Sequence, residues 1–116
     1  MNPEVQKAIE TRDALQSLLW QFKLLNQCYL IEISVYDLMH NNDYESKAGL
    51  RLRDRDMWSN PIEMDLETLM QRIQQFTGVE IKYEIHKEFA YPICFFDLKY
   101  LHRLYDAVYP LARIYA

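Results

Sequence analysis

The side chains most able to bind a metal or act as nucleophiles are those of His40, His86, His102, Cys28 and Cys94. Their spacing gives no ligand pair, because only Asp106 lies one helical turn from His102, and a single His–Asp pair is a weak signal for a metal. His86 falls on the polar side of an expected strand beside Lys87 and Glu88, which favours a solvated histidine. We therefore expect no metal site.

Catalysis by cysteine requires a thiol made acidic by a base or by a helix N-terminus. Cys94 comes shortly before the last expected helix, but Ile93, Phe95 and Phe96 surround it with apolar groups, which raise a thiol pKa. Both cysteines are expected to be free thiols that pack as small hydrophobic groups. Only two glycines occur, which excludes a glycine-rich phosphate loop. We expect neither a cofactor nor enzymatic activity.

Arg51, Arg53 and Arg55 form the one concentrated basic feature. On a strand they project from one face about 7 Å apart, a spacing that can follow phosphates. A solvated face or edge, neutralised by Asp54 and Asp56, explains them as well. The formal net charge of −4 argues against nucleic acid as the general partner, so we do not expect direct nucleic-acid binding.

Acidic side chains are more extensive than basic ones. Between Leu24 and Ser46 there are acids but no lysine or arginine, and residues 54–67 add five more acids against Arg55. If the loop near residue 43 and the connection near residue 58 meet at one end of a sheet, they form a negative patch. Ordinary solvated loops account for the same pattern.

The chain has nine tyrosines and two tryptophans, residue types that supply the energetic centres of protein interfaces. Tyr44 and Trp58 fall inside the acidic loops. Packing in the core or at a sheet edge is the alternative for each of them singly. We predict that the partner-binding residues are Asp37, Asp43, Tyr44, Glu45, Asp56 and Trp58.

These patterns favour a non-enzymatic protein-binding module, a small acidic inhibitor of the immunity, antitoxin or phage anti-defence (anti-CRISPR) type that blocks a basic, nucleic-acid-handling partner. One alternative is a homodimeric adaptor similar to a secretion chaperone, which holds an extended client. A second is a small enzyme without a motif. The first residues lack the pattern of a signal peptide and no apolar run is long enough to span a membrane, so we expect a cytoplasmic protein without a membrane partner.

The central element is predicted between Asp65 and Phe89. Apolar residues from Leu66 to Phe76 recur at three- and four-residue steps, Asp65 is a suitable N-cap, and Gly78 can close the helix in the left-handed conformation. Strict alternation from Val79 to Ile85 then predicts a strand with one apolar face.

Upstream, Asn2 and Pro3 start a helix whose pattern continues to about Cys28. Trp20 and Leu24 lie off its main apolar seam, which indicates either a broad buried face or a homodimer contact. Residues 29–38 are interpreted as a strand because of β-branched Ile31, Ile33 and Val35, although a continuing helix remains the competing interpretation.

The rest of the chain completes one domain over residues 1–116. A hairpin loop over His40–Lys47 precedes a strand with Leu50 and Leu52 inward, and 57–63 is an exposed connection. An apolar loop over 90–95 leads to a last helix capped by Asp97, with a kink or a break expected near Tyr109 because of Pro110. The fold class is therefore α+β, in the order α-β-β-α-β-α, with a small, mostly antiparallel sheet covered by helices.

Overall fold

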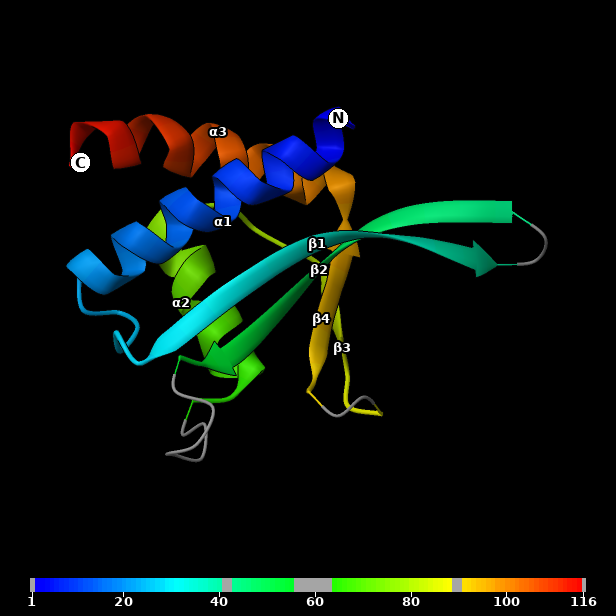
Figure 1. Cartoon of the computed structure of the whole chain (residues 1–116), viewed down its shortest axis with the longest axis horizontal. Helices are drawn as coiled ribbons and strands as arrows, with labels where there is room; N and C mark the ends of the chain where they lie inside the picture. Colours follow the sequence, from blue (N-terminus) through cyan, green and yellow to red (C-terminus); the bar gives the residue numbers. More distant parts are fainter. Residues whose placement is uncertain (1, 41–42, 56–63, 89–90, 116) are drawn as a thin grey trace.

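The computed structural model describes residues 2–40, 43–55, 64–88 and 91–115. Three helices and four strands alternate along the chain (Figure 1). In chain order they are α1 (Pro3–Gln21), β1 (Tyr29–His40), β2 (Asp43–Asp54), α2 (Leu66–Thr77), β3 (Tyr83–His86), β4 (Ile93–Asp97) and α3 (Leu98–Ile114). The expected α+β class is confirmed.

The strands form one antiparallel sheet in the order β1-β2-β4-β3. β1 and β2 make a long hairpin in which Ile31 lies opposite Leu52. β4 pairs with β2 only from Lys47 to Leu50, so the hairpin continues past β4 on one side. Figure 1 shows this part of the hairpin projecting beyond the helices.

The main core lies between the helices and one face of the sheet. Alternation places Ile31, Leu50, Cys94 and Phe96 on this face, and each is at most 1 % exposed. Leu15, Leu69 and Leu104 from the three helices belong to the same cluster and are fully buried. The helices therefore cover one face of the sheet, which we call the covered face; the other is called the open face.

Helix α2 forms as its sequence predicts. The Asp65 carboxylate accepts a hydrogen bond from the Thr68 amide at 2.8 Å, and Gly78 closes the helix with φ of 73°. Helix α1 is shorter than predicted, since it ends at Gln21 rather than near Cys28. Lys23 adopts a positive φ of 58°, which turns the chain out of the helix.

The third predicted strand is also shorter than expected. Of the stretch Val79–Ile85, only residues from Tyr83 onward belong to β3, which ends at His86. The preceding residues 79–82 belong to no strand, and one of them has a side chain as partner: the amide of buried Ile81 donates to Gln74 Oε1 at 2.8 Å. Because this backbone group is satisfied by α2, no strand partner is required there.

The apolar loop predicted over residues 90–95 is wrong, because Ile93–Asp97 is β4, an inner strand of the sheet. Pro92 stands just before the strand, where it removes no ladder hydrogen bond. The run from Ile93 to Phe96 is apolar on both faces, which is typical of a strand buried on both sides. The order is therefore α-β-β-α-β-β-α.

Two further boundaries differ from prediction. The loop expected over His40–Lys47 is shorter, since β2 begins at Asp43. Of the kink or break expected near Tyr109, the break does not occur: α3 continues to Ile114, and Leu111 packs against the core beyond the proline. Tertiary packing therefore outweighs the one hydrogen bond that Pro110 removes. The predicted connection 57–63 lies outside the described residues.

Candidate functional site

Four of the six predicted partner-binding residues lie on the part of the hairpin that projects past β4. We call residues 37–39 and 43–46 the hairpin tip; it contains Asp37, Asp43, Tyr44 and Glu45. Asp56 and Trp58 lie outside the described residues. The described residues that flank them, Arg55 and Met64, are at the opposite end of β2 from Asp43.

The hairpin tip exposes large apolar side chains between carboxylates. Met39 and Tyr44 are cross-strand partners and are 65 % and 74 % exposed. On the same side of the ribbon, the next pair toward the sheet is Asp37 and Ser46, and the Ser46 hydroxyl donates to the Asp37 carboxylate at 2.5 Å. Alternation puts Asp43 and Glu45 on the other side of the ribbon. Each side of the tip therefore carries negative charge.

The open face has a small apolar centre of its own. Phe95 is only 8 % exposed, with the rings of Tyr36 and His86 standing edge-on to it at centroid distances of 5.4 Å and 5.1 Å. Tyr36 fits because residue 49 is glycine: a Cβ at Gly49 would lie 2.4 Å from the Tyr36 ring. We call Tyr36, His86, Ile93 and Phe95 the open-face cluster.

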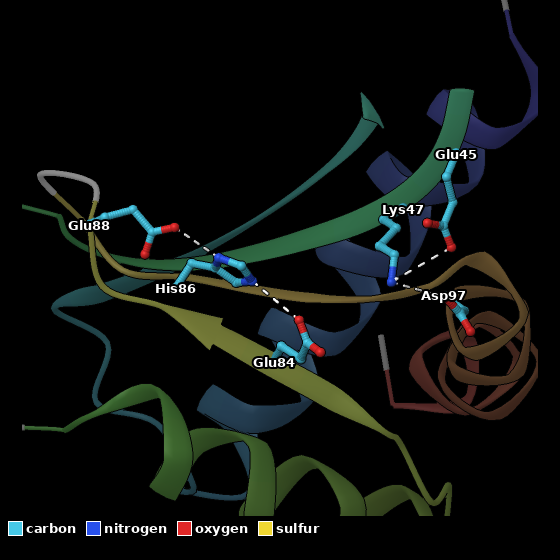
Figure 2. A network of polar contacts seen from close by, with 6 residues as sticks. All are labelled: Glu45, Lys47, Glu84, His86, Glu88 and Asp97. Atoms are coloured by element: carbon cyan, nitrogen blue, oxygen red, sulfur yellow. Dashed lines mark hydrogen bonds and ion pairs between the residues drawn. The ribbon is translucent and has the colours of Figure 1, made fainter. Parts of the chain in front are cut away.

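Carboxylates surround this cluster, as Figure 2 shows. His86 Nδ1 lies 2.9 Å from Glu88 Oε1, and its Nε2 lies 3.4 Å from Glu84 Oε2. The hydrogen bond with Glu88 is the main reason that the pKa of His86 is raised, with Glu84 acting in the same direction. Protonated His86 is therefore favoured by its two neighbours.

A second group of charges lies across the face from His86. Lys47 Nζ lies 3.5 Å from Asp97 Oδ1 and 3.8 Å from Glu45 Oε1 (Figure 2). Asp97 is the N-cap residue of α3 as predicted, but its side chain makes no capping hydrogen bond and faces Lys47 instead. Within this drawn network, four carboxylates share one lysine and one histidine, so deprotonation of His86 leaves it strongly negative.

A groove of about 510 Å³ connects the two groups of charges. It is lined by Leu38, Met39, Glu45, Lys47, Glu84, His86 and Phe95. Its walls come from the hairpin tip and from β3, and its floor is Phe95 of β4. Carboxylates at the rim of an apolar floor suit a long cationic side chain, because the carboxylates attract its charge and its methylene groups can pack on apolar surface.

Sequence reasoning placed Glu45 in the site but missed Lys47, Glu84, His86 and Phe95. His86 was expected to be solvated; it is instead partly covered and paired. The alternation of Glu84, His86 and Glu88 on one side of a strand was a usable signal. No comparable signal pointed to Phe95, because the strand that carries it was not predicted.

Several other polar side chains outside this network have structural partners. Arg53 pairs with Glu32 at 2.5 Å, and the Arg55 guanidinium lies over the Trp20 ring. Trp20 donates to the Tyr29 carbonyl at 3.1 Å, so it contacts its own chain. His102 links α3 to α1, with Nε2 3.0 Å from Glu4 and Nδ1 3.0 Å from Lys7.

Burial raises the pKa of the Cys94 thiol to about 12. Both cysteines are free.

Among the described residues, no His, Cys, Asp and Glu side chains are grouped as metal ligands. The described helices include none that is long and apolar enough to cross a membrane. Comparison of the chain with protein families, with curated proteins and with solved structures gives no match.

Proposed function

We propose that this protein is a non-enzymatic protein-binding module, an acidic inhibitor that covers a basic surface of a nucleic-acid-handling partner. The observation that supports this proposal is the hairpin tip, where Met39 and Tyr44 are exposed between carboxylates on a ribbon that extends beyond the domain. Exposed side chains of this size are typical of interface centres, and the surrounding charge selects a basic partner.

The open face adds to the same surface. Glu45 belongs to both the hairpin tip and the groove, so a partner that binds the tip also reaches the groove. An arginine or lysine of the partner enters the groove over Phe95 and pairs with Glu84 or Glu45. Asp43 and Glu45 are two residues apart on one strand, about 7 Å, an interval suited to basic side chains that otherwise follow a phosphate backbone.

The first experiment uses three baits for affinity capture from the source cells. One is the wild-type protein; the second carries Asp43→Lys and Glu45→Lys. A matched control carries Glu80→Lys and Asp106→Lys, which make the same change in net charge at exposed positions away from the hairpin tip. The partner is the protein retained by the wild type and the control but lost from the hairpin variant.

The kinetics with that purified partner then test the proposal. Charge reversal at the hairpin tip slows association, about tenfold or more, and the wild-type rate falls as salt rises, because the Debye length shrinks from about 10 Å at 0.1 M to about 3 Å at 1 M. Tyr44→Ala speeds dissociation by about thirtyfold, the effect of losing an interface centre of about 2 kcal/mol.

Binding that ignores salt and tolerates all of these changes contradicts the proposal and moves the interface elsewhere. Native mass measurement adds a second discrimination. A monomer that holds one basic protein agrees with an inhibitor, whereas a dimer that holds an unfolded segment agrees with the chaperone-like adaptor.

A further inference from the structure

The outer edge of β1 is sealed over its first residues by side chains from α1. Gln16 Oε1 accepts from the Ile31 amide at 2.8 Å, and Arg12 Nε donates to the Ile31 carbonyl at 2.7 Å. The Trp20 indole donates to the Tyr29 carbonyl. These three α1 residues are spaced four apart, so they lie on one stripe of the helix. At this end of β1, no strand can be added to the sheet.

Beyond Ile31 the sealing stops. In an antiparallel pair every second residue directs both backbone groups away from its partner strand, so Ile33, Val35 and Asp37 face outward as Ile31 does. Among the described residues, no hydrogen bond reaches the outward amide or carbonyl groups of these three. The edge from Ile33 to Asp37 therefore presents a ladder ready for another strand.

The stripe of α1 that carries Arg12, Gln16 and Trp20 changes from polar to apolar side chains at the same point. Continuing toward the N-terminus at steps of three and four, it carries Ile9 and Val5, which are 44 % and 37 % exposed. α1 and β1 lie side by side and run in opposite directions (Figure 1). From this spacing we infer that Ile9 and Val5 lie along the open part of the edge, as Arg12 and Gln16 lie along the closed part.

We infer that this edge takes an extended, basic segment of the partner as a fifth strand, hydrogen-bonded to Ile33, Val35 and Asp37. Apolar side chains of the segment pack on Ile9 and Val5. Its basic side chains meet Asp37 and continue toward the acidic hairpin tip. The inference rests on the proposed function and specifies how the partner is bound.

Charge decides between a partner segment and a second copy of this chain. β1 carries Glu32 and Asp37 but no lysine or arginine. Two copies paired edge to edge would place two acidic strands side by side with no lysine or arginine between them, so no opposite-charge pair could form across the new strand pair. A basic segment has the opposite charge and can form such pairs.

The probe is a dodecapeptide selected from a random displayed library on the wild-type protein. We expect the selected peptides to alternate apolar and basic residues. The best one is synthesised with an unmodified backbone and with N-methyl groups at alternate residues. Binding of the unmodified peptide protects the amides of Ile33, Val35 and Asp37 from hydrogen exchange, and N-methylation on the bonding side weakens binding about tenfold or more.

Two pairs of variants isolate the edge. Asp37→Pro and Asp37→Ala both remove the carboxylate, but only proline removes the outward amide, which has no partner in the free protein. We expect the proline variant to bind the peptide about tenfold more weakly than the alanine variant. Ile9→Ser weakens binding while Ile114→Ser, an equally polar change at a 75 % exposed site at the end of α3, does not. If the proline variant fails to fold, the comparison of Ile9→Ser with Ile114→Ser tests whether the peptide binds at this edge.

The outcomes separate this inference from the proposed function. A peptide that shifts the resonances of Tyr44, Glu84 and His86 but leaves the β1 amides exchanging freely overturns strand addition and keeps the acidic surface. Selected peptides without basic residues overturn the choice of partner. Protection of the β1 amides in a dimer without peptide assigns the edge to a second copy and also overturns the inference.

Discussion

The two faces of the sheet are built from the same strands but differ in the groups that shield their apolar side chains from water. On the covered face, Ile31, Leu50 and Phe96 come from three strands, and each is at most 1 % exposed beneath the helices. None of the described helices covers the open face, yet Phe95 is nearly as buried. Its cover comes from Tyr36 and from paired polar side chains.

This difference teaches where each kind of residue is needed. The covered face requires only apolar groups of suitable size, because helices supply the other half of its core. The open face must bury Phe95 and stay hydrated, so rings with a polar end lie over it: the Tyr36 phenol, and the His86 imidazole held by Glu84 and Glu88. We expect stability to depend on the first face and recognition on the second.

The largest effect is expected from Leu50→Ala on the covered face. Leu50 is fully buried, so the change should lower the free energy of unfolding by about 2–5 kcal/mol, measured by urea denaturation. Leu38→Ala removes the same atoms from the half-buried open side of the hairpin and should cost less than half as much. Equal losses would show that the two faces contribute alike.

Gly49→Ala should come next, at about 1–3 kcal/mol, because the new Cβ overlaps the Tyr36 ring and forces it away from Phe95. The same substitution in a Tyr36→Ala background should cost clearly less, since the overlapping ring is gone. A double-mutant cycle measures this coupling. If Gly49→Ala costs the same in both backgrounds, the cover of the open face does not depend on the glycine.

A smaller effect is expected from pH. The pKa of His86 is raised in the folded protein, so its pairing with Glu88 and Glu84 stabilises the fold fully below the unfolded histidine pKa of about 6.5, and this contribution is lost as pH rises through the higher folded pKa. Urea denaturation across this range should show a decline that His86→Gln lacks. Binding of a basic partner should change in the opposite direction, strengthening as His86 loses its charge.

The smallest effect on stability is expected from Tyr44→Ala at the hairpin tip. Tyr44 is 74 % exposed, so the free energy of unfolding should change by no more than about 0.5 kcal/mol. The same variant should release the partner faster, which separates stability from recognition at one residue. A loss of several kcal/mol on urea denaturation would mean that Tyr44 supports the fold.

Local patterns predicted the local elements well. The stretch from Asp65 to Gly78 carries its own helix period and both caps, and α2 forms between them as expected. β1 was predicted at its correct start from alternation and β-branching. These elements are determined by residues a few positions apart, so the chain around them adds little information.

The pattern failed where an element is defined by what surrounds it. Residues 93–97 show no alternation of apolar and polar residues, because β4 lies between β2 and β3 and is buried on both faces. Pro92, just before them, favoured a loop in the sequence analysis. Ile81 has the alternation of a strand, but the Gln74 side chain takes its amide. Both outcomes depend on neighbours that lie outside any local window.

The sequence by itself determined the acidic character of the chain, its α+β class and the exposure of Tyr44. Only the tertiary structure decided which charges meet: Lys47 faces Asp97, and Tyr36 lies over Gly49 against Phe95. The physical reason is that residue spacing specifies the period of an element, whereas strand order and register specify its neighbours, and these follow from packing the whole core.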